Sequence, residues 1–467
     1  MTPRPLAKAT IHVLSAPTVV NLEITEACNL KCRHCYNSWR AENASRVSLT
    51  KERLGELIEQ FVDAGVFHVV LTGGEPMAKM DLLEYGLTRC ADAGISVSCN
   101  SNLTLATPDK IKRLKDAGLD HILTSWCSSN RDEVAYIMGQ AGAYEKVVGG
   151  IRTATENGIR VSVNTIVSQN NKKRVYDSGA FLRELGVTQY FAHRVVPPPY
   201  DRGDRDQQLF LTPEEALFTL DELLRLKRDT GMTVGVLISY PLCMLGDLEK
   251  YSDFVGRGCP SQAGHRFSIS ATGDAHCCVM EDRSYGNVFE RGVRQAYANM
   301  ISWHDGSYHY EGCEGCDYIG ICECGCRMSA LARTGRMNGR DPLMLGMENI
   351  VKPFRLAGDR QAIQKIEKGA MFRVRKGIRL RKEAGFHVLN VRWGNTVIIE
   401  DDVAGFLGRF RDSGEEFDIG NFGVGRAREL ANLLYKDAVV SDEFPVNGWR
   451  STQGVSIDPS KLPTAYG

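Results

Sequence analysis

Three cysteines close to the N-terminus have the spacing of a metal-cluster site. Cys28, Cys32 and Cys35 form a C-x3-C-x2-C pattern directly after a stretch expected to be a strand. Thiolates are the usual protein ligands of iron–sulfur clusters, and three of them leave one iron of a four-iron cluster open. Structural zinc is the alternative, but it prefers four closed ligands. His34 lies between two of the cysteines, where the chain would have to double back to bind the same ion. The pattern therefore predicts an iron–sulfur cluster that can bind a further molecule.

A second group of cysteines occupies residues 259–326. It begins with a C-x13-G-x4-C spacing and ends with a C-x2-C-x5-C-x3-C run that contains one extra thiol. Its members are Cys259, Cys277, Cys278, Cys313, Cys316, Cys322, Cys324 and Cys326. In a chain of 467 residues without a signal-peptide pattern, such clustering favours metal ligation over a disulfide framework. The isolated cysteines on expected helices and strands are predicted to be buried small hydrophobic residues; these are Cys90, Cys99 and Cys127.

The elements that must position these thiols alternate from residue 17 to about 195. Short β-branched runs alternate with longer helical stretches, which indicates a parallel sheet with crossover helices. Periodicity leaves a doubly wound sheet and an incomplete barrel open. The expected strands are 18–25, 67–72, 95–100, 121–125, 160–167 and 188–193. A Pro- and charge-rich break at 196–208 and a helix at 213–229 follow, and regular periodicity then fades up to residue 346.

The first cysteine triad resembles the signature of the radical S-adenosylmethionine (SAM) family. Tyr36 follows the third cysteine as the aromatic residue of that motif. The next strand ends in Gly73, Gly74, Glu75 and Pro76, which resemble the family's GGEP element. Two glycines allow close backbone approach to a ligand, and a carboxylate can meet the methionine ammonium group of SAM. The resemblance covers about residues 17–195 and implies a partial (β/α)6 barrel.

The same resemblance implies the cofactors and the reaction. SAM and a [4Fe–4S] cluster would be bound, and an external one-electron reductant of the flavodoxin or ferredoxin type would supply the electron. SAM would split into methionine and a 5′-deoxyadenosyl radical, which would abstract hydrogen from the substrate. Polar contacts to SAM would come from Asn100 and Ser125, which close the third and fourth strands, and from Asn164, which lies on the fifth. A loop cap or strand-end hydrogen bond is the alternative for each.

The second cysteine group resembles the SPASM extension of radical SAM enzymes, which holds one or two auxiliary iron–sulfur clusters. By the family pattern, the first auxiliary cluster would use Cys259, Cys278 and Cys326, and the second would use Cys313, Cys316 and Cys322. The family usually has a further cysteine downstream of the run, and this chain has none there.

The fourth ligands of the auxiliary clusters therefore stay open at the level of sequence. The second cluster would have an open or non-thiolate site, or it would use Cys324. The first cluster would borrow Cys243 or Cys277. An auxiliary cluster can accept the electron left by a bond-forming reaction, and one with an open iron can instead hold a substrate group.

Residues 371–441 resemble the small PqqD-like winged fold that recognises precursor peptides in ribosomal-peptide modifying enzymes. The resemblance rests on a strand–turn–strand start and on a final helix around LANLLYKDAVV. It implies that a leader peptide adds as a strand to an exposed sheet edge. The alternative is a helical appendage that only packs on the barrel.

The sequence thus predicts an α/β chain with a partial (β/α)6 radical SAM barrel, a Cys-rich SPASM-like domain and a small winged-helix-like α+β domain. The expected divisions are an N-terminal extension (1–16), the barrel (17–212), a linker helix with the SPASM-like domain (213–346), a linker (347–370), the PqqD-like domain (371–441) and a loose tail (442–467).

Composition narrows the function classes further. The formal net charge is zero, which gives no bulk attraction to nucleic acid or an anionic membrane. No apolar run approaches the ~20 residues of a membrane-spanning helix, and we expect a cytoplasmic protein. We predict an enzyme that binds a precursor peptide and installs a carbon–carbon or thioether crosslink. The alternatives are another peptide modification (epimerisation, decarboxylation or excision), dehydrogenation of a small molecule, and a non-catalytic electron-transfer protein, which would leave the GGEP element unexplained.

Overall fold

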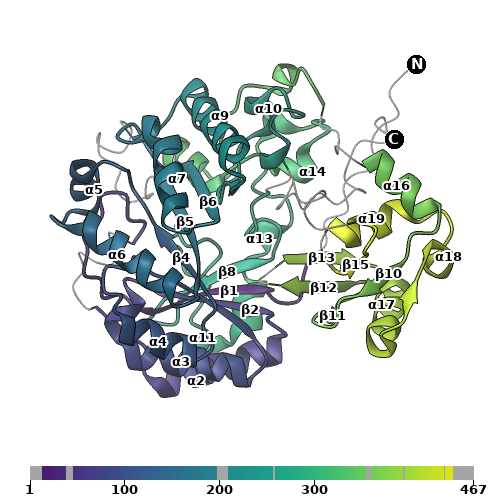
Figure 1. The fold of residues 1–467 in the computed structure, drawn as a ribbon, viewed down its shortest axis with the longest axis horizontal. Helices are drawn as coiled ribbons and strands as arrows, with labels where there is room; N and C mark the ends of the chain where they lie inside the picture. Colours follow the sequence, from purple (N-terminus) through teal and green to yellow (C-terminus); the bar gives the residue numbers. More distant parts are fainter. Residues whose placement is uncertain are drawn as a thin grey trace.

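A mostly parallel sheet runs through the larger part of the chain (Figure 1). The computed structural model describes residues 13–37, 46–196, 209–255, 258–353, 359–392, 395–435 and 437–444. The strands of the sheet are β1 (Val19–Thr25), β2 (His68–Gly73), β3 (Ser96–Asn100), β4 (His121–Ser125), β5 (Arg160–Val167), β6 (Gln189–Arg194), β7 (Thr233–Gly235), β8 (Arg266–Ile269) and β9 (Ala275–His276). Within the described residues their order is β7-β6-β5-β4-β3-β2-β1-β8-β9.

The first six strands lie in chain order and pair in parallel, with helices on the outside (Figure 1). The connecting helices are α2 (Lys51–Ala64), η1 (Pro76–Lys79), α3 (Met80–Asp92), α4 (Pro108–Asp116), α5 (Arg131–Met138), α6 (Ala143–Glu156), η2 (Lys172–Arg174), α7 (Val175–Glu184) and α9 (Pro213–Thr230). The predicted partial barrel is confirmed. Strand β7 extends its last edge, and β8, from the Cys-rich region, pairs in parallel with β1.

Local sequence signals explain where the barrel helices begin and end. Helix α2 begins after Thr50, whose side chain accepts the N–H of Arg53, and ends at Gly65 with φ 68°. Helix α9 begins with a reciprocal capping box between Thr212 and Glu215. These caps set where the helices begin and end, so that each crossover returns the chain to the start of the next strand.

Alternation along β6 shows which residues face the barrel interior. Tyr190 is fully buried and packs beside Gly179 of α7 and Leu226 of α9. Successive strand residues point to opposite faces of a sheet. His193 therefore points away from these helices, into the barrel.

The Cys-rich region contains short helices, as its weak periodicity predicted. They are α10 (Leu242–Leu245), η3 (Ser252–Phe254), α11 (Val288–Arg291), α12 (Val293–Ala298), α13 (Ile301–His304), η4 (Glu311–Cys313), α14 (Ile319–Cys322), α15 (Arg327–Thr334) and η5 (Met347–Asn349). Their buried side chains belong to the same hydrophobic core as the barrel. None of the helices in the described ranges is long and apolar enough to cross a membrane.

The C-terminal unit has a hydrophobic core of its own, built around Phe372, Leu407, Phe417 and Leu430. Its helices are α16 (Asp359–Glu367), α17 (Asp401–Ser413), α18 (Ile419–Phe422) and α19 (Ala427–Tyr435), and its strands are β10 (Phe372–Val374), β11 (Arg379–Lys382), β12 (His387–Arg392), β13 (Asn395–Ile399), β14 (Glu416–Phe417) and β15 (Val439–Val440). In the part of the chain described, they form two three-stranded sheets, ordered β14-β10-β15 and β11-β12-β13.

Helix α16 and strand β11 of this unit were not predicted from sequence, and neither were the short elements β14, α18 and β15. Helix α16 falls in the stretch expected to be a linker, and it adds fully buried Ile366 to the core of the unit. Strand β11 reads RLRK, whose two arginines mask the alternation expected of a half-buried strand.

Those arginines dock the C-terminal unit onto the barrel. Arg381 donates to the carbonyls of Ala16 at 2.7 Å and Pro17 at 2.9 Å, and Arg379 donates to that of Phe67 at 2.6 Å. Phe67 also belongs to a shared apolar cluster with Val388 of β12. The carbonyls precede β1 and β2, so the unit sits beside the amino ends of these strands (Figure 1).

Candidate functional site

The carboxyl end of β2 holds the segment that leads to the first cysteine triad. The N–H of Gly74 donates to the carbonyl of Thr25, and the N–H of Glu75 donates to that of Ala27, both at 2.7 Å. A Cβ on Gly73 would lie 2.2 Å from the Thr25 oxygen, and one on Gly74 would lie 2.3 Å from the Ala27 oxygen. Only glycine permits this approach. In the structure the two glycines make room for the cysteine loop, and the predicted approach of their backbone to a ligand stays a prediction.

The cysteine loop is also fastened to helix α5. The N–H of Arg33 donates to the carbonyl of Ile137 at 2.9 Å, and its Nε donates to that of Tyr136 at 3.1 Å. Half-buried Tyr36 follows the triad, and Asn37 then donates through Nδ2 to the carbonyl of Gly73 at 3.4 Å. The loop is therefore held on two sides before any cofactor binds.

The three thiols of the triad are half-buried and lie within electrostatic range of one another. Burial, together with the charges of Cys127, Cys35 and Cys28, raises the pKa of Cys32. The N–H of Leu30 points to the sulfur of Cys28 at 3.5 Å. Ligands must be deprotonated, so metal binding would displace protons from these thiols.

Three thiols on one braced loop fit an iron–sulfur cluster as a donor set. In the described ranges, however, the structure shows no group of three His, Cys, Asp or Glu side chains that is already arranged to hold a metal ion.

Glu75 is fully buried and connects the ends of β2 and β3. Its Oε1 accepts the N–H of Met77 at 2.9 Å and the hydroxyl of Ser101 at 2.7 Å, and its Oε2 accepts the N–H of Asn102 at 2.7 Å. Burial raises the pKa of this carboxyl, and the three hydrogen bonds oppose the rise. Pro76 starts helix η1 directly after it. The carboxylate therefore braces the loop after β3, and its predicted contact with the SAM ammonium group stays a prediction.

Two of the three polar residues named from sequence lie opposite each other on neighbouring strands. Ser125 pairs in register with Asn164, whose Oδ1 is buried without a hydrogen-bond partner in the described structure. Asn100 ends β3. Sequence reasoning missed His193, which is 5% exposed and has a buried, unpartnered Nδ1. Its position near the end of β6 was the available signal.

These orphaned atoms fit a ligand with its own hydrogen-bonding groups, such as SAM, because buried polar atoms are normally paired. Burial, with the charges of Arg194 and His34, lowers the pKa of His193 to about 3. Its imidazole is therefore neutral, and one of its nitrogens can accept a hydrogen bond.

The first auxiliary group converges from three distant segments. Burial and the charges of Cys259 and Cys326 raise the pKa of Cys278, while burial, Glu323 and Cys326 raise that of Cys259 to about 12. The backbone N–H of Cys326 donates to Asp341 Oδ2 at 2.8 Å. The thiols predicted for the first auxiliary cluster are thus brought near one another.

Cys277 lies within electrostatic range of Cys259 and Cys278. Its sulfur lies 3.7 Å from the carbonyl oxygen of Ser261 and 3.7 Å from His304 Nε2, and the side chain is fully buried. Buried Cys90, Cys99 and Cys127 likewise belong to the core, as predicted.

The second auxiliary group gathers Cys313, Cys316, Cys322 and Cys324, and it also includes Cys243. Burial and the charges of Cys324, Cys243 and Cys316 raise the pKa of Cys322 to about 12. A hydrogen bond with Cys313 lowers the pKa of Cys324. From sequence, Cys243 was one candidate ligand of the first auxiliary cluster. In the structure, the segment around α10 places this thiol within electrostatic range of Cys316 and Cys322, in the second group.

A buried ion pair connects the barrel to the auxiliary region. Arg194, at the end of β6, donates to both carboxylate oxygens of Asp341 at 2.7 and 2.6 Å, and to the carbonyl of Ser239 at 2.8 Å. The side chains are 3% and 0% exposed. Because Asp341 also accepts the N–H of Cys326, the barrel strand positions a predicted cluster ligand.

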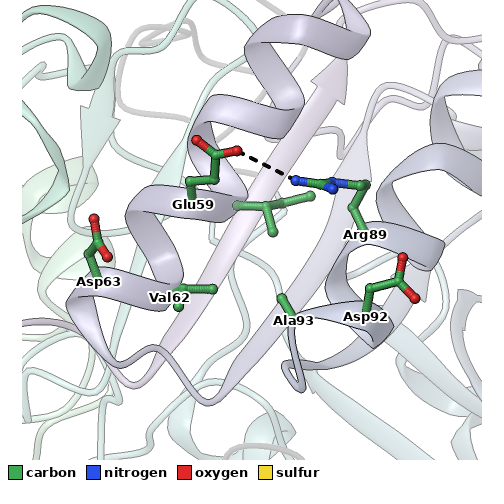
Figure 2. Close-up of a pocket in the computed structure, with 7 residues that line it drawn as sticks. Glu59, Val62, Asp63, Arg89, Asp92 and Ala93 are labelled. Carbon is green, nitrogen blue, oxygen red and sulfur yellow. Dashed lines mark ion pairs between the residues drawn. The ribbon is translucent and has the colours of Figure 1, made fainter.

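A surface hollow lies between α2 and α3 (Figure 2). It is lined by Asp63 and Asp92, and an ion pair of 3.5 Å joins Glu59 to Arg89 across it. These residues lie near the carboxyl ends of their helices, whereas the cysteine loop follows the carboxyl end of β1. The hollow is not part of the candidate site.

Comparison with known proteins agrees with this geometry. Residues 22–174 match the model of the Radical SAM superfamily, over the segment that contains the triad and the first five strands. The parallel barrel and the braced triad lie largely in the segment that matches, so this part of the chain is similar to enzymes of the radical SAM class.

Individual relatives have low sequence identity, but the matches cover most of both chains. The chain is 26% identical over 353 residues to an AdoMet-dependent heme synthase of Methanosarcina barkeri, covering 71% of this chain and 97% of the relative. It is 24% identical over 345 residues to a PqqA peptide cyclase of Bradyrhizobium diazoefficiens, covering 72% and 88%. Among solved structures, Streptococcus suis SuiB superposes with a TM-score of 0.55 at 16% identity, covering 71% and 78%. Because the sequence identity to SuiB is low, this match supports the fold alone.

Proposed function

We propose that this protein is a radical SAM peptide maturase, which modifies a ribosomally made precursor peptide. The observation that carries the proposal is the C-terminal unit, which has its own core and is docked on the barrel by Arg379 and Arg381. Relatives named PqqA peptide cyclase support a peptide substrate. A solved SuiB structure with its precursor peptide SuiA has the same fold, with a TM-score of 0.54 at 16% identity over 70% of this chain and 76% of that one.

The C-terminal unit offers strands for a leader peptide. Within the described residues, each of its two sheets has only three strands, so the outer strands pair on one side. An added strand satisfies the unused backbone groups of such an edge. We propose that the unit is PqqD-like and tethers the leader in this way.

The position of the unit sets a requirement on the substrate. The unit docks at the amino ends of β1 and β2, while the cysteine triad follows the carboxyl end of β1. The seven residues of β1 span about 23 Å at ~3.3 Å each. The segment between leader and modified residues must cover at least this distance.

The proposed reaction is crosslinking by hydrogen abstraction. Bound SAM, after one electron from a flavodoxin- or ferredoxin-type reductant, supplies the radical that takes one hydrogen atom from the peptide. Joining two peptide positions removes a second hydrogen as a proton and an electron, and that electron needs an acceptor. We propose that auxiliary clusters on the two groups of thiols in residues 243–326 are this acceptor.

Iron analysis tests the number of clusters. If the triad and both auxiliary groups each hold a four-iron cluster, the anaerobically reconstituted protein should contain about twelve irons and a similar number of sulfides per chain. Colorimetric iron and sulfide assays on protein of known concentration measure this. A value near four irons would contradict the auxiliary clusters while leaving the first cluster in place.

Removal of the C-terminal unit tests the tether. In protein lacking residues 371–467, binding of a short synthetic leader peptide should be lost, because the strands that would pair with it are gone. Isothermal titration or fluorescence anisotropy measures the dissociation constant. Iron content of the truncated protein is the control, because the deletion uncovers Phe67. Leader binding that survives the deletion unchanged would contradict the tether.

Chemistry on a small molecule is the second candidate, because relatives named AdoMet-dependent heme synthase match as extensively as the peptide cyclases. The leader experiment separates the two candidates. A small-molecule enzyme should bind no leader peptide either before or after the truncation.

A further inference from the structure

The second auxiliary group contains more thiols than a four-iron cluster can use. Its members are Cys243, Cys313, Cys316, Cys322 and Cys324. Three of them belong to the C-x2-C-x5-C run, so the choice of the fourth ligand lies between Cys243 and Cys324. The choice matters, since a cluster with four thiolates has no iron left to bind a substrate.

Helix α10 brings Cys243 to the cysteine run. The backbone N–H of the preceding residue, Leu242, points to the sulfur of Cys322 at 3.5 Å. Cys243 also acts electrostatically on both Cys316 and Cys322. Its side chain is half-buried, unlike that of Cys324, and it belongs to a segment about eighty positions away in the sequence.

The segment after the run clamps α10 in this position. Asn349 donates through Nδ2 to the carbonyl of Cys243 at 2.6 Å, and the N–H of Val351 donates to the carbonyl of Gly246 at 3.0 Å. Met344, in the same downstream stretch, places its sulfur 3.8 Å from that of Cys313. This stretch contains no cysteine, and instead it holds in place a helix that carries one.

Cys324 is held in a different way. It is 1% exposed and has a left-handed backbone with φ 57°. Its sulfur is hydrogen-bonded to Cys313 and to the backbone of Tyr310, and its carbonyl accepts the guanidinium of Arg327. These contacts already occupy the thiol and fix its backbone.

We propose that Cys243 is the fourth ligand of the second auxiliary cluster, and that Cys324 supports Cys313 from outside it. The inference rests on the auxiliary clusters proposed above. A cluster closed by four thiolates is an electron acceptor and not a substrate-binding site. A closed cluster therefore suits the role of accepting the electron that leaves the peptide during crosslinking.

The test compares Cys243→Ser with the matched variant Cys324→Ser in the full chain, reconstituted anaerobically. Mössbauer spectra and iron content should show that Cys243→Ser loses about one iron in four from one auxiliary cluster, or that cluster altogether. Cys324→Ser should keep the wild-type spectrum and iron content. Cys243→Asp, which retains an anionic oxygen ligand, should recover most of the iron with a shifted reduction potential.

Each opposite result has a distinct meaning. A cluster lost in Cys324→Ser and kept in Cys243→Ser would overturn the assignment in favour of Cys324. Wild-type spectra in both variants would also overturn it, because the second cluster would then have a non-thiolate ligand. Both variants are repeated in a background with Cys28, Cys32 and Cys35 replaced by alanine, where about eight irons should remain. An iron-free background would contradict the auxiliary clusters themselves.

Discussion

Replacing Cys28, Cys32 and Cys35 together by alanine should reduce SAM cleavage to the rate seen without protein. These are the only thiols in the described part of the loop between β1 and α2, where half-buried His34 lies between two of them. Burial lowers the pKa of His34 to about 4, and one imidazole cannot replace three thiolates around a cluster. The measurement is the amount of 5′-deoxyadenosine formed from SAM under a strong reductant, separated by chromatography.

The matched control for the triad variant is Cys90→Ala. Cys90 is fully buried in the core on α3, so its replacement should leave SAM cleavage within about two-fold of wild type and cost at most about 1 kcal/mol of stability. Leader binding to the triad variant should match that of wild type, because the C-terminal unit has a separate core. Cleavage of SAM that persists in the triad variant would show that the cluster lies elsewhere.

Replacing Arg194 by methionine should be among the most destabilising single substitutions in this chain. It would leave the Asp341 carboxylate buried without its cation, and removing one partner of a buried ion pair costs about 3–5 kcal/mol. The same change removes the cation that holds the Asp341 carboxylate, which accepts the N–H of Cys326. The midpoint of thermal unfolding should therefore fall by several degrees, and the auxiliary-cluster absorption should be lost before the barrel unfolds. Differential scanning fluorimetry and visible absorption measure the two effects.

An exposed ion pair provides the comparison for Arg194. Arg113 is paired with Glu84 at 2.7 Å, but its side chain is 40% exposed. Surface pairs contribute about 0–1 kcal/mol, so Arg113→Met should shift the midpoint little. The double variant Arg194→Met/Asp341→Leu should recover part of the loss, because no unpaired charge remains. Equal midpoints for Arg194→Met and Arg113→Met would contradict the role given to the buried pair.

The barrel could be predicted from sequence because its signals are local. Most strands between residues 17 and 195 are short apolar runs followed by a helix, and some of these helices have clear caps, such as Thr50 and Gly65 around α2. The secondary structure of the C-terminal unit was harder to predict from sequence. Arg379 and Arg381 make β11 polar in sequence, although the sheet needs them as docking groups.

The spacing of Cys28, Cys32 and Cys35, with the Gly73–Gly74–Glu75 turn one unit later, indicates the kind of chemistry without coordinates, because each motif lies within a few residues. The contacts between these motifs appear only in the folded chain. In the folded chain, the two glycines make room for the cysteine loop, and Glu75 accepts hydrogen bonds from the loop after β3. Folding also brings Cys243 to a run of cysteines far along the chain. Spacing reports neighbours along the chain, whereas these contacts join segments that meet only when the core packs.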